Sequence, residues 1–287
     1  MGEDLKVGVL GAGMMGAEIA LCFAAIGCEV ILMDTSIDLV KAAKNRLSIV
    51  LDKAIKKEKF EADNKEKTLN LISPVENFSS MHDANLIVEA VVEKIDVKKE
   101  VFLKIDKICA ADCILASNTS SIPITEIAAF VSTKRAQNII GMHFFSPAYI
   151  MKLVEVIPGY LTSKATLNRA KKVLKSIGKT PIEVKDVSGF AVNRLLNSFF
   201  IEAIRLLEEG VATKEDIDTA CKLGLGHPVG PFELLDLTGL DLNLNVHEVL
   251  FNEYGDRFRP RPLLKRMVAA GLYGRKSKVG FYKYNKK

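Results

Sequence analysis

Residues 5–16, LKVGVLGAGMMG, join a short apolar run to a turn that contains three glycines. The segment that follows, Ala17 to Ile26, has the composition of a helix. Strand, glycine turn and helix in this order form the arrangement that binds the pyrophosphate of a dinucleotide. Gly11 permits the tight turn, Gly13 lets the backbone approach the phosphates, and Gly16 allows close packing of helix on strand. The segment therefore predicts a dinucleotide site at a helix N-terminus.

A second strand-like run, Glu29 to Met33, ends at Asp34. An acid roughly 20 residues after the glycine turn can bind the ribose 2′-hydroxyl, and it repels the 2′-phosphate of NADP. No arginine immediately follows Asp34. We therefore predict that the cofactor is NAD, and we expect Met14 and Met15, between the glycines, to lie beside it.

Strands and helices keep alternating through the middle of the chain. Apolar strands are predicted over Asn85–Val92 and Cys113–Ala116, on either side of a helix over Val97–Cys109. Such runs indicate a parallel sheet covered on both faces, with ligands at the carboxyl ends of its strands. Turn and cap chemistry is the alternative explanation for the polar residues expected at that edge. These residues are Glu93 with Lys98, and Ser117 to Ser121 (SNTSS).

An amphipathic helix with basic outer faces is predicted after Asp34. Most of its lysines are expected on a solvated face. The cluster Lys56, Lys57 and Lys59 could also meet a polyanionic substrate handle, such as the phosphates of coenzyme A. The predicted apolar stripe consists of Leu39, Ala43, Leu47, Val50 and Ala54.

Glu155 stands between Val154 and Val156 in an apolar run and needs a partner if it is buried. If the chain reverses about Tyr149, a return strand sets His143 and Glu155 side by side. A histidine steered by a carboxylate suits proton transfer to and from a secondary alcohol while hydride moves to or from a nicotinamide. The alternative is a core histidine bonded to a backbone carbonyl, with Glu155 reaching solvent.

Composition excludes several classes of protein. The 287 residues are 48% hydrophobic and 26% charged, with a net charge of +5, which is typical of a globular protein without a nucleic-acid-binding arm. The five cysteines form no CxxC pair, so we expect neither a disulfide framework nor a metal site, and a cytoplasmic protein fits best. No basic leader or apolar span of about 18 residues is visible. We therefore expect no membrane partner.

The chain carries, in order, the motifs GAGMMG, VEAVVE, SNTSS, GMHFF, MKLVEVI, GFAVNR, GHPVGPFEL and GRKSKVGFY. In these motifs it resembles the L-3-hydroxyacyl-CoA dehydrogenase family, and most of all its bacterial 3-hydroxybutyryl-CoA members. The resemblance implies an α/β Rossmann-type NAD-binding domain over residues 1–185. An all-α domain for substrate binding and dimerisation would follow over residues 186–287, so a homodimer is expected. The pattern after Asp186 is helical, including a helix over Ala191–Gly210 with Leu195, Phe199, Ala203 and Leu206 on one stripe.

The resemblance also implies catalytic roles for four residues. His143 would be the general acid and base, and Glu155 its orienting partner. Ser120 would hydrogen-bond the 3-oxygen of the substrate. Asn193 would help to hold the substrate near that serine.

Further roles follow for the cofactor and for coenzyme A. Asn118, Glu93 and Lys98 would contact the nicotinamide side of the cofactor, and Lys57 would contact coenzyme A. Ser146 replaces an asparagine that is usual in the family, so we expect an altered contact there with the cofactor or the substrate. Serine still donates and accepts, but it is shorter and lacks the amide pair.

The sequence thus predicts an NAD-dependent oxidoreductase that interconverts (3S)-3-hydroxybutyryl-CoA and acetoacetyl-CoA, a reaction of fatty acid and butyrate metabolism. One alternative is a related dehydrogenase of a free hydroxy acid or sugar acid, which coenzyme A dependence would distinguish. Another is a catalytically silent dinucleotide-binding protein. The presence of both His143 and Glu155 argues against that alternative.

Overall fold

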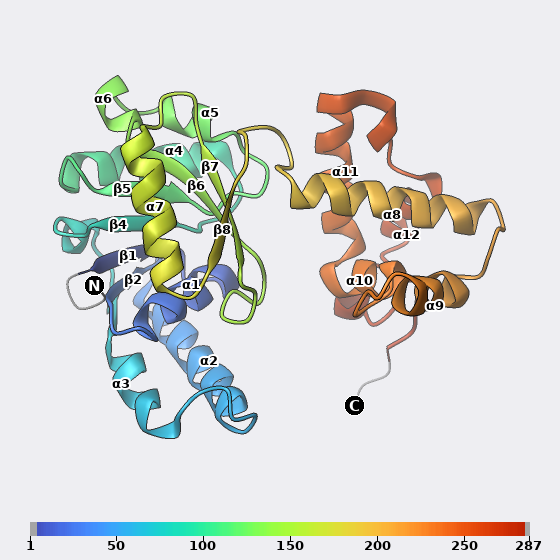
Figure 1. Cartoon of the computed structure of the whole chain (residues 1–287), viewed down its shortest axis with the longest axis horizontal. Coiled ribbons are helices and arrows are strands. Elements are labelled where there is room, and N and C mark those ends of the chain that lie inside the picture. The colour runs from blue at the N-terminus through green and yellow to red at the C-terminus, as the bar shows by residue number, and fades with distance from the viewer. Residues whose placement is uncertain (1–4, 285–287) are drawn as a thin grey trace. The chain divides into compact units, whose positions relative to one another are not determined.

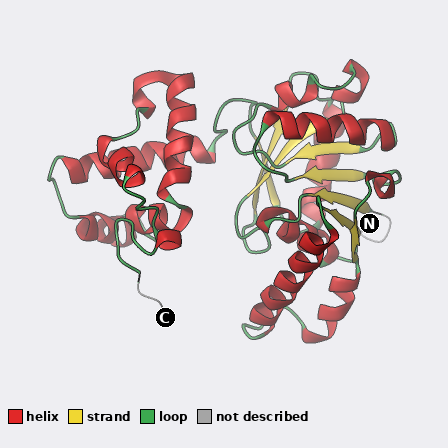
Figure 2. Cartoon of the chain, turned by 180° about the vertical axis from the view of Figure 1, so that it is seen from behind, coloured by secondary structure: helices red, strands yellow, loops and turns green. Residues whose placement is uncertain are grey.

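The computed structural model describes residues 5–284. The chain divides into two compact units between Val187 and Ser188. The first unit is a sheet with helices on both faces, and the second consists of helices joined by loops, as Figures 1 and 2 show. This confirms the predicted fold class, a Rossmann-type α/β domain followed by a helical domain.

The strands of the first unit form one sheet in the order β3-β2-β1-β4-β5-β6-β7-β8. Neighbouring strands are parallel, except for the antiparallel pair β6 and β7. The predicted parallel sheet is therefore confirmed from β3 to β6, whereas β7 and β8 run the other way. The strands are β1 (Lys6–Leu10), β2 (Glu29–Met33), β3 (Ile72–Val75), β4 (Leu86–Glu89), β5 (Ile114–Ser117), β6 (Ile139–Phe144), β7 (Leu153–Pro158) and β8 (Thr180–Glu183).

Helices pack on both faces of this sheet (Figure 1). One face is covered by α1 (Met14–Ala24), α2 (Ile37–Ile55) and α7 (Lys164–Ser176), which share a hydrophobic core with the strands. The other face carries α4 (Ile95–Ile108) and α5 (Ile124–Ala128). The shorter helical segments are η1 (Ala62–Asn64), α3 (Lys65–Asn70), η2 (Phe78–Met81) and α6 (Thr133–Ala136).

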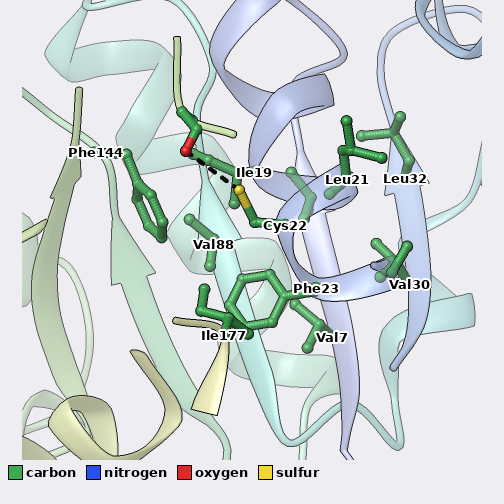
Figure 3. Close-up of a cluster of buried hydrophobic side chains, with 14 of the residues drawn as sticks. Val7, Ile19, Leu21, Cys22, Phe23, Val30, Leu32, Val88, Phe144 and Ile177 are labelled. Carbon is green, nitrogen blue, oxygen red and sulfur yellow. Dashed lines mark hydrogen bonds between the residues drawn. The ribbon is translucent and has the colours of Figure 1, made fainter. Parts of the chain in front are cut away.

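Side chains of α1 pack directly on the strands (Figure 3). Ile19 and Phe23 are fully buried in the cluster that also contains Val7, Val30 and Val88. Burying a side chain of this size contributes roughly 1.5–3 kcal/mol relative to leaving it exposed. This packing holds the N-terminus of α1 at the carboxyl end of β1, where ligands of such sheets bind.

The buried face of α2 differs from the predicted stripe. Ala43 and Leu47 are buried as predicted. Leu39, however, is 49% exposed, whereas Val40 and Leu51 are buried. Residues three and four apart share a helix face, so two stripes offset by one residue share some members. Contact with the sheet selected the stripe that begins at Val40.

The strand predicted over Asn85–Val92 ends early, at Glu89. Beyond it, the Ala90 amide donates to the Leu10 carbonyl at 2.7 Å, and the Val91 amide donates to the Glu89 carboxylate at 2.8 Å. The chain therefore leaves β4 to pass close behind the glycine turn. An apolar pattern alone does not report this change of direction.

The helices of the second unit bury one face each against a common core. In α8, Leu195 of the predicted stripe is 74% exposed, whereas Phe200 and Ile204 are fully buried. Both sides of this helix carry apolar residues, so packing within the chain buries a different face from the predicted stripe. The helices are α8 (Val192–Glu208), α9 (Lys214–Gly224), α10 (Pro231–Thr238), α11 (Leu240–Tyr254), η3 (Gly255–Phe258), α12 (Pro262–Ala269) and η4 (Arg275–Ser277).

A buried carboxylate fastens the end of the described chain to α10. Asp236 is 1% exposed and accepts hydrogen bonds from the amides of Phe281 and Tyr282, each at 2.8 Å. The Tyr284 hydroxyl donates to the same carboxylate at 2.9 Å. The GFY part of the last motif therefore has a structural role in the second unit.

His247 is a buried histidine of α11. It is fully buried, and among residues 5–284 neither ring nitrogen has a hydrogen-bond partner. Burial lowers the pKa of His247 to about 4, because a charged imidazolium loses its hydration there. The helical unit therefore holds this side chain in its neutral form near neutral pH.

We expect His247 to make stability depend on pH. An unfolded histidine binds a proton below about pH 6.5, whereas the folded one does so only near pH 4. The contribution of His247 to the free energy of unfolding should therefore be level above pH 6.5 and fall between pH 6.5 and 4, by roughly 3 kcal/mol in total. Urea unfolding of His247→Leu at pH 7.5 and 5.0 should show a smaller loss than the wild type. The exposed His82→Gln serves as the control, and equal losses in wild type and His247→Leu would contradict the expectation.

Candidate active site

The glycine turn leaves open space in front of α1. Gly11 has φ +100°, and a Cβ on it would lie 2.4 Å from the Ala90 carbonyl oxygen. A Cβ on Gly16 would lie 1.8 Å from the Gly11 carbonyl oxygen. Gly13 is the N-cap of α1, and a Cβ there would meet nothing within 4 Å. The turn therefore fits a pyrophosphate that approaches the free amides of the helix N-terminus.

Asp34 and Arg46 hold the turn at the peptide groups of Ala12. Asp34 Oδ2 accepts from the Ala12 amide at 2.6 Å, and Arg46 Nη2 donates to the Ala12 carbonyl at 2.7 Å. Sequence reasoning placed Arg46 on the basic outer faces of the helix after Asp34, now α2, and did not predict its contact with the turn. The arginine is engaged with the protein backbone in this structure.

A cavity of about 460 Å³ lies beside the turn. Its lining includes Asp34, Glu76 and Glu100, together with Phe78 and Lys104. Glu76 also accepts from the Ile37 amide, the first residue of α2, at 3.2 Å. Three carboxylates favour a neutral ribose over a phosphate in this cavity. Glu76 and Glu100 belong to no motif in the sequence, so their place in this cavity was not predicted.

Lys98 lies in a buried ion pair at the carboxyl edge of the sheet. Its Nζ contacts Glu89 Oε1 at 2.7 Å and Glu93 Oε2 at 3.1 Å. Lys98 is 1% exposed and Glu89 is fully buried. Glu89 also accepts from the Ser117 hydroxyl at 2.6 Å. Glu89 was not predicted as a site residue, because it lies within an apolar strand. A buried lysine nevertheless requires such a partner.

The residues of SNTSS gather around Glu93. Its Oε1 accepts from the Thr119 hydroxyl and from the amides of Ser120 and Ser121 at 3.1 and 3.2 Å. Burial alone would raise the pKa of Glu93, but the Lys98 charge and these hydroxyl donors outweigh it and lower that pKa. Glu93 is therefore a charged carboxylate that organises the loop after β5.

Asn118 connects this loop to the strand that carries His143. Its side-chain oxygen accepts from the Phe144 backbone amide at 2.8 Å. Its backbone amide donates to the Glu89 carbonyl at 2.7 Å. Asn118 therefore stabilises the local turn, as the alternative explanation for the polar residues of SNTSS predicted. These bonds join the ends of β4 and β6 through Asn118 at one edge of the sheet.

The hairpin formed by β6 and β7 pairs His143 with Glu155 in its register, as predicted from a reversal about Tyr149. His143 Nδ1 lies 2.8 Å from Glu155 Oε2. His143 is 7% exposed and Glu155 is fully buried. The alternative in which Glu155 reaches solvent is therefore wrong.

Ser146 lies in the loop of the hairpin and contacts the residue that follows the glycine Gly13 in the turn, Met14. Its hydroxyl is 3.8 Å from the Met14 sulfur, and Met14 is 68% exposed in the first turn of α1. Met15 follows it in the same turn. The structure therefore brings Ser146 and Met14 together, although sequence reasoning placed each at the cofactor separately.

A second cavity of the first unit contains Lys57. It measures about 440 Å³ and is lined by Lys53, Lys57, Lys59 and Lys179, together with Phe60, Tyr149 and apolar side chains. Lys56 is not among its lining residues. Two of the three clustered lysines thus share one concave surface with aromatic rings.

Asn193 belongs to the second unit, at the second position of α8. Its carbonyl accepts from the Asn197 side-chain amide at 2.7 Å. Asn197 is 2% exposed. This bond ties Asn193 to the following turn of the helix.

The part of the chain from residue 5 to 284 has no helix that is long and apolar enough to cross a membrane. Within it, no group of three or more His, Cys, Asp or Glu side chains is placed to hold a metal ion. All five cysteines are buried and free.

Comparison with known proteins identifies the family. Residues 6–187 match the 3-hydroxyacyl-CoA dehydrogenase NAD binding domain, and residues 189–284 match the C-terminal domain of that enzyme. The chain belongs to the 3-hydroxyacyl-CoA dehydrogenase family. It is therefore an oxidoreductase whose cofactor is NAD, and the glycine turn and the acidic cavity beside it fit that cofactor.

Relatives of this dehydrogenase chain match over nearly their whole length. The 3-hydroxybutyryl-CoA dehydrogenase of Clostridioides difficile is 45% identical, over 98% of this chain and 100% of its own. The mitochondrial hydroxyacyl-coenzyme A dehydrogenase of Sus scrofa is 45% identical, over 97% and 90%. The crystal structure of (S)-3-hydroxybutyryl-CoA dehydrogenase PaaH1 from Ralstonia eutropha has a TM-score of 0.93 and 42% identity, over 98% and 99%.

Substitution of Asp34 should relax the discrimination against NADPH. Asp34→Asn removes the charge but keeps an oxygen for the Ala12 amide, whereas Asp34→Ala removes both. We expect both variants to raise the ratio of kcat/KM for NADPH to that for NADH by about tenfold or more, since a like charge no longer opposes the 2′-phosphate. Only Asp34→Ala should also weaken NADH binding. An unchanged ratio in both variants would show that the cofactor is distinguished elsewhere.

Proposed function

We propose that the protein interconverts (3S)-3-hydroxybutyryl-CoA and acetoacetyl-CoA, with His143 and Glu155 as the acid/base pair. The observation that carries the proposal is the buried contact of 2.8 Å between His143 Nδ1 and Glu155 Oε2. The names of the bacterial relatives support a four-carbon acyl group.

His143 moves the proton of the substrate hydroxyl. Glu155 contacts Nδ1, so it favours the tautomer that carries its proton there and leaves Nε2 as the base. In the oxidative direction Nε2 takes the hydroxyl proton, and in the reductive direction it returns that proton to the 3-oxygen. The buried negative charge of Glu155 stabilises the imidazolium formed between these steps. NAD, when bound, supplies the hydride acceptor for oxidation.

Ser120 and Asn193 are the proposed ligands of the substrate 3-oxygen. Hydroxyl and amide donors polarise a carbonyl and stabilise negative charge that develops on its oxygen. Ser120 lies in the loop that Glu93 organises, and Asn193 lies near the start of α8.

The cofactor is proposed to extend along the carboxyl edge of the sheet. Gly11, Gly13 and Gly16 would admit the pyrophosphate, and Asp34 would bind the adenosine ribose. Glu93, Lys98 and Asn118 would contact the nicotinamide side, where Lys98 keeps Glu93 in place. Met14, Met15 and Ser146 would also lie beside the cofactor.

Coenzyme A is proposed to bind in the cavity of Lys57. Lys53, Lys57 and Lys59 offer three positive charges to its phosphates, and Phe60 and Tyr149 offer rings to its adenine. No such feature is needed for a free hydroxy acid. The cavity therefore favours an acyl-CoA substrate over the related reaction on free acids.

We further propose a cytoplasmic homodimer assembled through the second unit. Several large apolar side chains of that unit are exposed, which marks interaction surfaces in soluble proteins. Leu195, Leu237 and Leu242 are 74, 52 and 56% exposed. A self-complementary dimer would remove such leucines from water.

Turnover with acetoacetyl-CoA tests the proposed function. NADH oxidation should be rapid with acetoacetyl-CoA and at least about a hundredfold less efficient in kcat/KM with free acetoacetate, since the lysine cavity then contributes no binding energy. Steady-state kinetics with both substrates and both reduced nicotinamides provide the measurement. Equal efficiency with the free acid would favour the hydroxy-acid alternative. Binding of NADH without turnover of either substrate would indicate a silent protein.

Replacement of His143 should abolish most of the proton transfer. We expect His143→Gln to lower kcat by about two to four orders of magnitude, the scale of lost general acid/base catalysis. Glu155→Gln should lower kcat less, because the imidazolium loses its negative partner while an amide oxygen can still accept from Nδ1. His82→Gln is the matched control, because His82 is 68% exposed in its side chain. Near-normal turnover of His143→Gln would reject the assigned role.

A further inference from the structure

Two buried charged residues hold the turn between β6 and β7. Glu18 lies in α1, Lys179 immediately precedes β8, and each is 8% exposed. Glu18 Oε2 accepts from the Ala148 amide at 2.5 Å. Lys179 Nζ donates to the Ala148 carbonyl at 2.5 Å and to the Met151 carbonyl at 2.9 Å. A carboxylate and an ammonium thus bind the two backbone groups of one residue.

Burying the charged groups of Glu18 and Lys179 among apolar side chains opposes folding, because both groups lose their hydration. The Cys22 thiol also donates to the Ala148 carbonyl, at 3.4 Å, the bond drawn as a dashed line among the apolar side chains of Figure 3. Burial raises the pKa of Glu18, and the Ala148 amide and the Lys179 charge oppose that rise. Each buried ion carries a desolvation penalty, and apolar residues often fill such a place with no loss of stability. Stability alone therefore gives little reason for this pair.

The backbone that the pair holds connects three parts of the proposed site. Ser146, two residues before Ala148, contacts Met14 of the nucleotide-binding turn. The strands on either side of the turn carry His143 and Glu155. Tyr149, the next residue, lines the cavity with the lysines, and so does Lys179. A shift of Ala148 would therefore move three things together: the contact of Ser146 with Met14, the pair of His143 and Glu155, and the cavity wall at Tyr149.

We propose that Glu18 and Lys179 are positioning residues for hydride transfer. By binding Ala148 at its N–H and its C=O, they hold residues 145–151 in the arrangement that aligns His143 and Ser146 with substrate and cofactor. This inference rests on the proposed role of His143. Neither residue contacts the reacting atoms in this account, and each acts through the backbone of the turn.

The test compares four variants of the full-length chain. Glu18→Leu and Lys179→Met each remove one hold on Ala148, and Glu18→Gln retains an oxygen acceptor for its amide. Lys171→Met is the matched control, because Lys171 forms an exposed ion pair with Glu183 between α7 and β8 at 2.5 Å. Turnover is measured with acetoacetyl-CoA and with NADH that carries deuterium or hydrogen at the transferred position.

We expect kcat to fall by about ten- to a hundredfold in Glu18→Leu and Lys179→Met, the scale of a small misplacement of reacting groups. The deuterium isotope effect on kcat should rise in both variants, because the hydride step becomes slower than the other steps. Glu18→Gln should recover most of the rate, and Lys171→Met should match the wild type. A general loss of folded enzyme would lower the rate without changing the isotope effect. Rates and isotope effects within twofold of Lys171→Met would overturn the proposal.

Hydrogen exchange separates this inference from the proposed function. The Ala148 amide should exchange faster in Glu18→Leu than in wild type or Lys171→Met, because its acceptor is gone. If the Ala148 amide exchanged equally fast in Glu18→Leu and in wild type, the claim that Glu18 holds the turn would be wrong. This result does not depend on whether Lys179→Met folds. A wild type that does not turn over acetoacetyl-CoA would instead contradict the proposed function, and the exchange at Ala148 would still decide whether the turn is held.

Discussion

A carboxylate enclosed by apolar strands is stable only where a donor meets it, and the site of this protein is organised around that constraint. Glu155 is fully buried between two valines of β7, and His143 of β6 meets it at 2.8 Å. The antiparallel register sets these residues opposite each other, so the backbone pairing positions the histidine before any ligand binds. The same constraint explains Glu89 with Lys98, because either residue alone would leave a buried charge.

The sheet decides where the chemistry can take place. Its parallel strands direct their carboxyl ends to one edge, where the loops after β1, β4 and β5 meet. At that edge Glu93 gathers the amides of Ser120 and Ser121, and Asn118 bonds the backbone of β6. Polar residues from separate parts of the chain thus form one continuous network. A dehydrogenase needs this continuity, because cofactor, substrate and base must be aligned within a fraction of an ångström.

The antiparallel hairpin adds a second level of organisation. The parallel strands carry the glycine turn at their carboxyl edge, whereas β6 and β7 turn the chain back and set the proposed acid/base pair, His143 and Glu155, opposite each other. The turn of that hairpin is bound by Glu18 from α1 and by Lys179 from the segment before β8. Elements on both sides of the hairpin therefore determine its position. The lysine cavity shares Lys179 and Tyr149 with this region, which links the proposed coenzyme A site to the same backbone.

Local spacing in the sequence was enough to predict the glycine turn, the position of Asp34 at the end of the second strand, and the register of His143 with Glu155. Each of these depends on residues close together in the chain. The order of motifs was enough to identify the family. Only the tertiary structure revealed Glu89 as the partner of Lys98, Arg46 on the turn, and Glu18 with Lys179 on Ala148. The partner of a buried charge is chosen by proximity in space, and residues far apart in sequence leave no local pattern. The buried stripes of α2 and α8 were likewise decided by packing, since helical periodicity alone permits neighbouring faces that share residues.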